Sequence, residues 1–210
     1  MMTYMLVHGL GQNATSWQKV IDYMKIDSEK IVSPDLFQFI EAGKIDYRNL
    51  YHNFFDYCEN QDGSIDLGGL SLGAILSLNY ALDRPEKVNS LILINTQYKM
   101  PQFLLSVQNV IFQVLPNSVF KKMGLPKKDA IQLMKSMKEL DFSMRLSAIS
   151  CKTLILCGEK DKPNRKAAKQ LSNLIMDAKL KFIQSAGHEA NVDNPEGMAK
   201  IIKSFWVENT

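Results

Sequence analysis

Residues 64–85 constrain the fold more than any other part of the chain, because three local patterns meet there. Residues 64–68 form a short, mostly apolar run that suits a buried strand. Residues 72–82 are apolar nearly all round, as in a buried helix, and Pro85 prevents that helix from continuing. The segment therefore predicts a strand and a helix that are joined by only a few residues.

The residues between this strand and helix include Gly69, Ser71 and Gly73, in the pattern Gly-x-Ser-x-Gly. In a nucleophile elbow with this pattern, the serine takes a strained backbone conformation and its hydroxyl projects from the carboxyl end of a sheet. The glycines are needed on steric grounds, because a Cβ would collide where strand and helix come closest. The pattern predicts that Ser71 is a nucleophile; the alternative is a turn that merely contains a serine.

Size and charge exclude several other classes of protein. The chain has 210 residues, of which 46% are hydrophobic, and this is enough for one full core and predicts a single domain over residues 1–210. Its 25 basic and 22 acidic residues are interspersed, whereas nucleic-acid-binding proteins gather basic side chains on one stripe. We therefore expect no nucleic-acid partner.

The cysteines and the N-terminus bear on location. Cys58, Cys151 and Cys157 are odd in number and lack metal-ligand spacing, so they predict neither a disulfide framework nor a zinc site. The apolar run at residues 4–7 is too short for the core of a signal peptide or for a membrane span. These features predict a cytoplasmic protein with reduced thiols and no membrane span.

Strand and helix patterns alternate along the chain. Continuous apolar runs predict about six strands, at residues 3–7, 30–33, 64–68, 89–94, 153–157 and 180–183. Amphipathic or buried helical patterns lie between and after them, at residues 16–24, 47–59, 72–82, 165–176 and 195–207. This alternation predicts an α/β fold with a mostly parallel sheet, right-handed crossovers and helices on both faces.

Two loops downstream of Ser71 offer the other groups that serine chemistry needs. Acyl transfer by serine requires a base within hydrogen-bond reach and an acid that orients the base. Asp161 follows the predicted strand at residues 153–157, and His188 follows the last predicted strand. Because loops after the carboxyl ends of parallel strands share one edge, the three side chains can converge there. Glu159 is the alternative acid.

In this order, Ser71, Asp161 and His188 resemble the nucleophile, acid and base of the α/β-hydrolase family. The resemblance covers nearly the whole chain. It extends to three further motifs, which are His-Gly after the first strand at residues 8–9, Arg-Pro-Glu-Lys-Val at residues 84–88 and Asn-Pro-Glu at residues 194–196.

The resemblance implies the α/β-hydrolase fold and an oxyanion hole made by the backbone N–H groups of Leu10 and Leu72. It also implies that His8 holds the oxyanion loop, while His188 acts as the base. The chain departs from the family pattern in two ways. We expect the two strands that usually precede the His-Gly motif to be missing, and residues 36–38 replace an arginine and glycines that many relatives carry.

Residues 97–149 break the alternation, because they contain apolar helical stretches and no strand candidate. An insertion of this size between two strands predicts a small helical lid over the carboxyl edge of the sheet. We expect the lid to supply an apolar acyl pocket in which Phe112 and Met134 contact the substrate. The alternative is that these side chains only pack the lid onto the body.

The sequence thus predicts a carboxylesterase-like serine hydrolase that cleaves a small-molecule ester or thioester through an acyl-enzyme, without a metal or organic cofactor. The alternative is a non-hydrolytic member of the same fold, such as a lyase or a small-molecule binding or sensor protein, since one fold hosts many chemistries. The intact set of Ser71, Asp161 and His188 favours the hydrolase. The oligomeric state and the partner of the strand residue Asp66 are left open.

Overall fold

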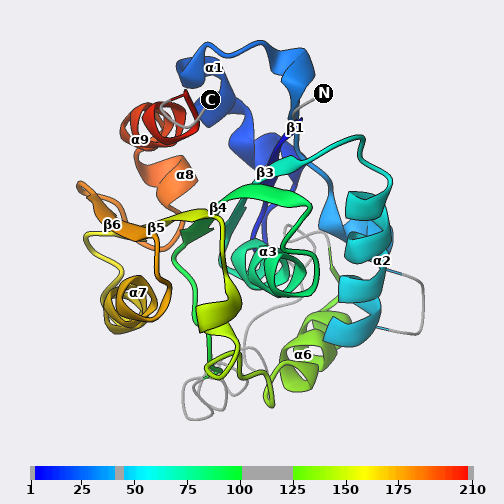
Figure 1. Ribbon diagram of the computed structural model, residues 1–210. Helices are drawn as coiled ribbons and strands as arrows, with labels where there is room; N and C mark the ends of the chain where they lie inside the picture. Colours follow the sequence, from blue (N-terminus) through cyan, green and yellow to red (C-terminus); the bar gives the residue numbers. More distant parts are fainter. Residues whose placement is uncertain (1–2, 41–44, 101–124, 208–210) are drawn as a thin grey trace.

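The computed structural model describes residues 3–40, 45–100 and 125–207, and a six-stranded sheet lies at its centre (Figure 1). All five strand pairings are parallel, which confirms the α/β architecture predicted from the alternation of strands and helices. In spatial order the strands are β2 (Ile31–Val32), β1 (Thr3–Val7), β3 (Ile65–Leu70), β4 (Val88–Ile94), β5 (Lys152–Gly158) and β6 (Ala178–Ile183).

Helices cover both faces of the sheet (Figure 1). One face packs against α1 (Gln18–Met24), α8 (Ala190–Asp193) and α9 (Pro195–Val207). The other face packs against α2 (Tyr47–Glu59), α3 (Leu72–Asp83), α6 (Lys127–Ser136) and α7 (Lys162–Leu174). None of the helices within these described ranges combines the length and the apolarity that a membrane crossing needs.

Strand side chains alternate between the two cores that the helices close. On β4, Leu91 and Leu93 belong to the core beneath α3, whereas Ile92 and Ile94 belong to the core beneath α9. Successive side chains of a strand point to opposite faces, so a strand covered on both sides must be apolar at every position. This explains why the central strands are continuous apolar runs rather than alternating ones.

The edge strand β6 is longer than its predicted range. It begins at Ala178, two residues before the predicted start, because Lys179 and Lys181 are exposed on it and interrupt the apolar pattern. Charged side chains on an edge strand discourage pairing with another chain. By contrast, α2 and α9 have the bounds that their amphipathic patterns predicted.

Asp66, which had no partner in the sequence, contacts two side chains of the neighbouring strand. It is 2% exposed near the start of β3, and its Oδ1 accepts hydrogen bonds from Asn89 Nδ2 at 2.8 Å and Ser90 Oγ at 2.5 Å. Burial raises the pKa of the Asp66 carboxyl, while the two hydrogen bonds act in the opposite direction. We call these three residues the amino-edge cluster.

The described part of the predicted lid contains one α-helix. Helix α6 packs beside α2, where Tyr47 N donates to Ser136 Oγ at 2.8 Å, and an isolated antiparallel bridge joins Lys99 and Asp141. Met134 lies on α6 and is 6% exposed within the core beneath α3, while Phe112 lies outside the described residues. The lid and the contact of either side chain with a substrate therefore remain predictions.

Candidate active site

Ser71 lies at the sharp turn between β3 and α3. Its φ of 53° and ψ of −113° are rare for a residue with a side chain, and its backbone N–H donates to Ile94 O at 2.9 Å. A Cβ at Gly69 would overlap the backbone of Gly73, and a Cβ at Gly73 would overlap the carbonyl oxygen of Val7. The predicted steric need for both glycines is thus confirmed, and the turn presents Ser71 at the carboxyl edge of the sheet.

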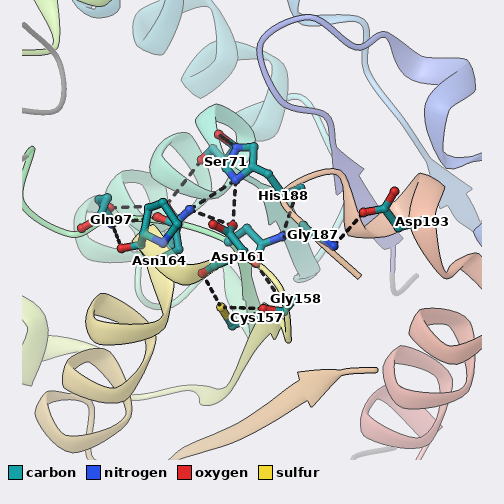
Figure 2. Close-up of polar contacts among 12 residues, drawn as sticks. Ser71, Gln97, Cys157, Gly158, Asp161, Asn164, Gly187, His188 and Asp193 are labelled. Carbon is teal, nitrogen blue, oxygen red and sulfur yellow. Dashed lines mark hydrogen bonds and ion pairs between the residues drawn. The ribbon is translucent and has the colours of Figure 1, made fainter. Parts of the chain in front are cut away.

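The structure brings the three sequence-predicted residues into one chain of contacts (Figure 2). His188 Nε2 lies 3.1 Å from Ser71 Oγ, and His188 Nδ1 lies 2.8 Å from Asp161 Oδ2. The Asp161 side chain is 3% exposed, whereas the His188 side chain is 50% exposed. The carboxylate is therefore shielded from water, while the imidazole faces the space in which a ligand can approach.

Proton positions in this cluster follow from its acceptors. An ionised carboxylate can accept hydrogen bonds but cannot donate them. The proton of a neutral His188 ring therefore lies on Nδ1 and is donated to Asp161. Nε2 is then unprotonated and accepts the hydroxyl hydrogen of Ser71. This is the arrangement that allows a serine to lose its proton to an imidazole.

The alternative acid, Glu159, points elsewhere. Its Oε2 accepts a hydrogen bond from the backbone N–H of Ser185 at 3.0 Å, and the residue is exposed. Glu159 thus holds the loop that leads to His188, and Asp161 is the carboxylate that contacts the imidazole.

Asn95, which sequence reasoning missed, fixes the backbone around the imidazole. It follows β4 with a φ of 48°, and its Nδ2 donates to the carbonyl oxygens of Gly187 at 3.0 Å and His188 at 2.7 Å. Its Oδ1 accepts from Gly158 N at 2.8 Å. One side chain thus joins the ends of β4, β5 and β6. Its position directly after a predicted strand was a signal that could have identified it.

Two further polar side chains surround Asp161. Asn164, which is 7% exposed, donates from Nδ2 to Asp161 Oδ2 at 2.8 Å. Gln97 donates from Nε2 to Asn164 Oδ1 at 2.7 Å (Figure 2). No sequence motif pointed to either residue, because their meeting depends on how the start of α7 packs against the segment after β4.

The predicted oxyanion donors lie at two chain turns beside Ser71. Leu72 is the first residue of α3, so its N–H has no acceptor within the helix, and the helix N-terminus carries partial positive charge. Leu10 follows Gly9, whose carbonyl oxygen accepts from Gln12 N at 3.2 Å. Within the part of the chain that the structure describes, neither Leu10 N nor Leu72 N donates a hydrogen bond.

His8 supports the loop that carries Leu10. It is fully buried, its Nδ1 contacts Gly9 O at 2.9 Å, and its Nε2 accepts from the backbone N–H of Leu36 at 3.0 Å. Burial lowers the pKa of the His8 ring, with weaker opposing effects from Gly9 and Asp35. The ring is therefore a neutral structural link, as the family resemblance implied.

A cavity of about 640 Å³ lies beside the site, between the segment after β4, the return of the predicted lid and α7. Tyr98, Met100 and Leu140 contribute apolar surface to it, and Gln97, which also lines it, donates to Asn164 Oδ1. Neither Ser71 nor Met134 is among the residues that line it.

Comparison with known proteins identifies the family. Residues 5–201 match the sequence profile of the Alpha/beta hydrolase family, and the chain therefore belongs to that family.

A curated relative and two solved structures are similar to the chain. The pimeloyl-[acyl-carrier protein] methyl ester esterase of Legionella pneumophila (strain Lens) is 26% identical over 148 residues, which cover 68% of this chain but only 59% of the relative. A thermophilic esterase from Thermogutta terrifontis superposes with a TM-score of 0.79 at 20% identity, over 100% of this chain and 90% of the esterase. MenH from S. aureus superposes with a TM-score of 0.82 at 18% identity, over 99% and 94% of the two chains. These superpositions support the α/β-hydrolase fold.

Proposed function

We propose that this protein is a serine hydrolase that cleaves a carboxylic ester or thioester of a small molecule through an acyl-enzyme intermediate. The observation that carries the proposal is the contact of Ser71 Oγ with His188 Nε2 at 3.1 Å, at a strained turn and in line with the 2.8 Å contact between His188 and Asp161. A serine that only terminated a strand would need neither the strained backbone nor the imidazole.

In the first half of the proposed reaction, Ser71 Oγ attacks the carbonyl carbon of the substrate and its proton passes to His188 Nε2. Asp161 keeps the ring in the correct tautomer and stabilises its positive charge. The N–H groups of Leu10 and Leu72 donate to the oxygen that becomes negative in the tetrahedral intermediate. His188 then gives its proton to the leaving alcohol or thiol, and the acyl group remains on Ser71.

In the second half, water replaces the leaving group. His188 removes a proton from the water as it attacks the acyl carbon, and the same two N–H groups bind the second oxyanion. Return of the proton to Ser71 Oγ releases the carboxylic acid. These steps balance without a metal or organic cofactor.

The comparisons support an ester as the substrate class, because the Legionella relative is named for a methyl ester and the Thermogutta structure is an esterase. The identities and the partial coverage leave the particular substrate to be found by experiment. The free cysteines Cys58, Cys151 and Cys157 fit a cytoplasmic location, which is also part of the proposal.

The decisive experiment is labelling with a fluorophosphonate, followed by assay on p-nitrophenyl esters. Ser71 should be the labelled residue, and Ser71→Ala should remove labelling and nearly all turnover while circular dichroism shows an intact fold. His188→Ala should lower the rate by about 10²- to 10⁴-fold, the usual contribution of general acid–base catalysis. Labelling of another serine, with turnover retained in Ser71→Ala, would show that the assignment is wrong.

We further propose that residues 97–149 form a lid whose apolar side chains, including Phe112 and Met134, bind the acyl chain. Each buried methylene contributes about 0.8 kcal/mol, so kcat/KM should rise as the acyl chain lengthens from about two carbons and fall once the pocket is full, before about twelve. Phe112→Ser or Met134→Ser should flatten this profile. A flat profile in the unchanged enzyme would leave the segment with a purely structural role.

A further inference from the structure

We propose that Asn164 and Gln97 are positioning residues that hold the Asp161 carboxylate toward His188 and away from the helix that Asp161 begins. This inference rests on the proposed hydrolase function, which it deepens by assigning roles to two side chains outside the three that react. Its physical basis is a competition for the Asp161 carboxylate between the imidazole and the first turn of α7, where the backbone N–H of Asn164 donates to the main-chain oxygen of Asp161.

Asp161 occupies the N-cap position of α7, where an aspartate usually bonds its side chain to a backbone N–H of the first turn. Here the Asp161 side chain makes no such bond. The backbone N–H of Asn164, in the first turn, donates instead to the main-chain oxygen of Asp161 at 3.2 Å. Pro163 has no N–H, so the backbone N–H of Asn164 is the first-turn donor that the Asp161 carboxylate would meet if it turned away from His188.

The start of α2 has the same Asp-x-x-Asn spacing, at Asp46 and Asn49, but there the aspartate side chain does bond to the helix backbone. Asp46 and Asn49 therefore serve as a reference within the same protein. Asp46 is the N-cap of α2, and its Oδ1 accepts from the backbone N–H of Asn49 at 2.8 Å. The Asn49 side chain adds a contact to Asp46 Oδ2 at 3.1 Å. At α7 the first turn carries Pro163 and the backbone of Asp161 is less extended, with φ −80° and ψ 68° against −142° and 168° at Asp46. In addition, Asp161 faces an imidazole, and the Asn164 side chain is itself held by Gln97.

Asn164 and His188 donate to the same carboxylate oxygen. Both Asn164 Nδ2 and His188 Nδ1 lie 2.8 Å from Asp161 Oδ2, and the two nitrogens are 3.2 Å apart. Two donors that converge on one oxygen fix the rotation of the carboxylate, because turning it toward the helix would break both bonds. Asn164 thus supplies a second hydrogen bond that keeps the Asp161 carboxylate in contact with the imidazole.

Gln97 fixes which end of the Asn164 amide faces Asp161. Gln97 Nε2 lies 2.7 Å from Asn164 Oδ1 and 3.4 Å from Pro163 O, so two acceptors surround it and the nitrogen must point toward them. With Gln97 donating to Asn164 Oδ1, the NH₂ group of Asn164 is directed at the carboxylate (Figure 2). The path of contacts therefore runs from the segment after β4, through α7, to Asp161 and His188.

Other charged groups near His188 are engaged elsewhere. Among the described residues, Asp161 is the one charged side chain within ion-pair distance of the imidazole. On the flanking loop, Glu159 accepts from Ser185 N at 3.0 Å and Asp193 accepts from Gly187 N at 2.7 Å. Glu189 is exposed, and Ser71 and Asn164 are uncharged. Asp161 is therefore the charged partner whose loss from the imidazole a test must detect.

The test is Asn164→Ala, with Asn89→Ala as the matched control. Asn89 donates to the other buried aspartate, Asp66, at the same 2.8 Å distance, so its removal deletes the same bond at the opposite edge of the sheet. Asn164→Ala should lower kcat by about 10- to 100-fold, the worth of a hydrogen bond to a charged group, and should change KM by less than about threefold. Asn89→Ala should leave both constants unchanged.

NMR of the His188 ring N–H gives a readout that does not depend on turnover. If Asn164 holds Asp161 in place, Asn164→Ala lets the carboxylate turn to the helix, and the downfield Nδ1–H signal of a ring bonded to a carboxylate should weaken or move upfield, toward the spectrum of Asp161→Ala. Gln97→Ala should shift the signal the same way by less. An unchanged signal overturns the proposal, since Asp161 then stays on the ring without Asn164.

The outcomes separate this inference from the function on which it rests. If the unaltered protein neither reacts with a fluorophosphonate nor hydrolyses esters, the hydrolase proposal is wrong, while the Nδ1–H signal of His188 still decides whether Asn164 positions Asp161. If Asn164→Ala does not fold by circular dichroism, Gln97→Ala carries the test, because Gln97 is only half-buried and lies at the rim of the cavity.

Discussion

Two buried aspartates lie at opposite ends of the strands, one at the amino edge of the sheet and one at the carboxyl edge, and they differ in the side chains that they contact. Asp66, near the start of β3, is 2% exposed, and Asp161, after the end of β5, is 5% exposed. Each accepts a hydrogen bond of 2.8 Å from an asparagine, Asn89 in one case and Asn164 in the other. Burial and a satisfied carboxylate are therefore common to both edges and do not by themselves define a site.

The two aspartates differ in the side chain that donates to the carboxylate besides the asparagine. Asp66 accepts from the hydroxyl of Ser90, which stays neutral, whereas Asp161 accepts from an imidazole that can take up a proton. The imidazole in turn contacts Ser71 at a strained turn, and the hydroxyl of Ser90 offers no such continuation. Comparing the two edges teaches that the chemistry resides in the titratable partner and the strained serine, not in the buried acid.

The first prediction replaces each of the two buried aspartates by asparagine, which exchanges one carboxylate oxygen for an NH₂ group. Asp161→Asn should lower kcat by up to about 10⁴-fold, because an amide at this position favours the wrong imidazole tautomer, as in the Ser-His-Asp template. Asp66→Asn should leave kcat within about twofold, since the side-chain hydrogen bonds of Asp66 among the described residues join it to Asn89 and Ser90 and not to Ser71 or His188. The measurement is steady-state hydrolysis of a p-nitrophenyl ester. A fully active Asp161→Asn enzyme together with an inactive Glu159→Gln enzyme would move the acid to Glu159.

The second, smaller prediction concerns stability at the amino-edge cluster. Burial raises the pKa of Asp66 in the folded protein above the unfolded value of about 3.9. A raised acid pKa contributes stability below the unfolded value and loses it as the pH rises through the folded value. Asp66→Asn cannot ionise and keeps an oxygen that accepts from Asn89 and Ser90, so it should gain stability relative to the natural protein as the pH rises.

Thermal melts at about pH 4 and about pH 8 measure this effect. A difference of about 1 kcal/mol corresponds to about 2–4 °C in a protein of this size, and the Tm of Asp66→Asn should exceed that of the natural protein by that order at the higher pH only. Asp62→Asn, at an exposed position, is the control and should show no such trend. An advantage of the variant that is equal at both pH values would exclude ionisation of Asp66 as the cause.

The sequence predicted those features that depend on local pattern. Strand and helix periodicity predicted the parallel sheet and the bounds of α2 and α9, and the Gly-x-Ser-x-Gly pattern predicted the turn at Ser71. The order of Ser71, Asp161 and His188 along the chain was enough to place them at one edge, because a parallel sheet collects the loops after its strands.

What the sequence did not reveal depends on contacts between distant segments. Asp66 finds its partners on β4, more than twenty residues away, and this pairing follows from the strand register. Gln97 and Asn164 are 67 positions apart, and neither lies in a motif. An asparagine at the start of a helix is expected to serve the helix backbone, so a role toward a neighbouring carboxylate becomes visible only in three dimensions.

The three hydrogen bonds of the Asn95 side chain affect how such a protein can evolve. Of their partners, Gly158 is the last residue of β5, Gly187 and His188 lie in the loop after β6, and all three lie outside residues 97–149. The backbone that carries His188 is thus tied to β4 and β5 without help from the long insertion that separates these two strands. Mutation can lengthen, shorten or replace the insertion beyond Gln97, and a protein engineer can graft another in its place, while this backbone link is inherited unchanged.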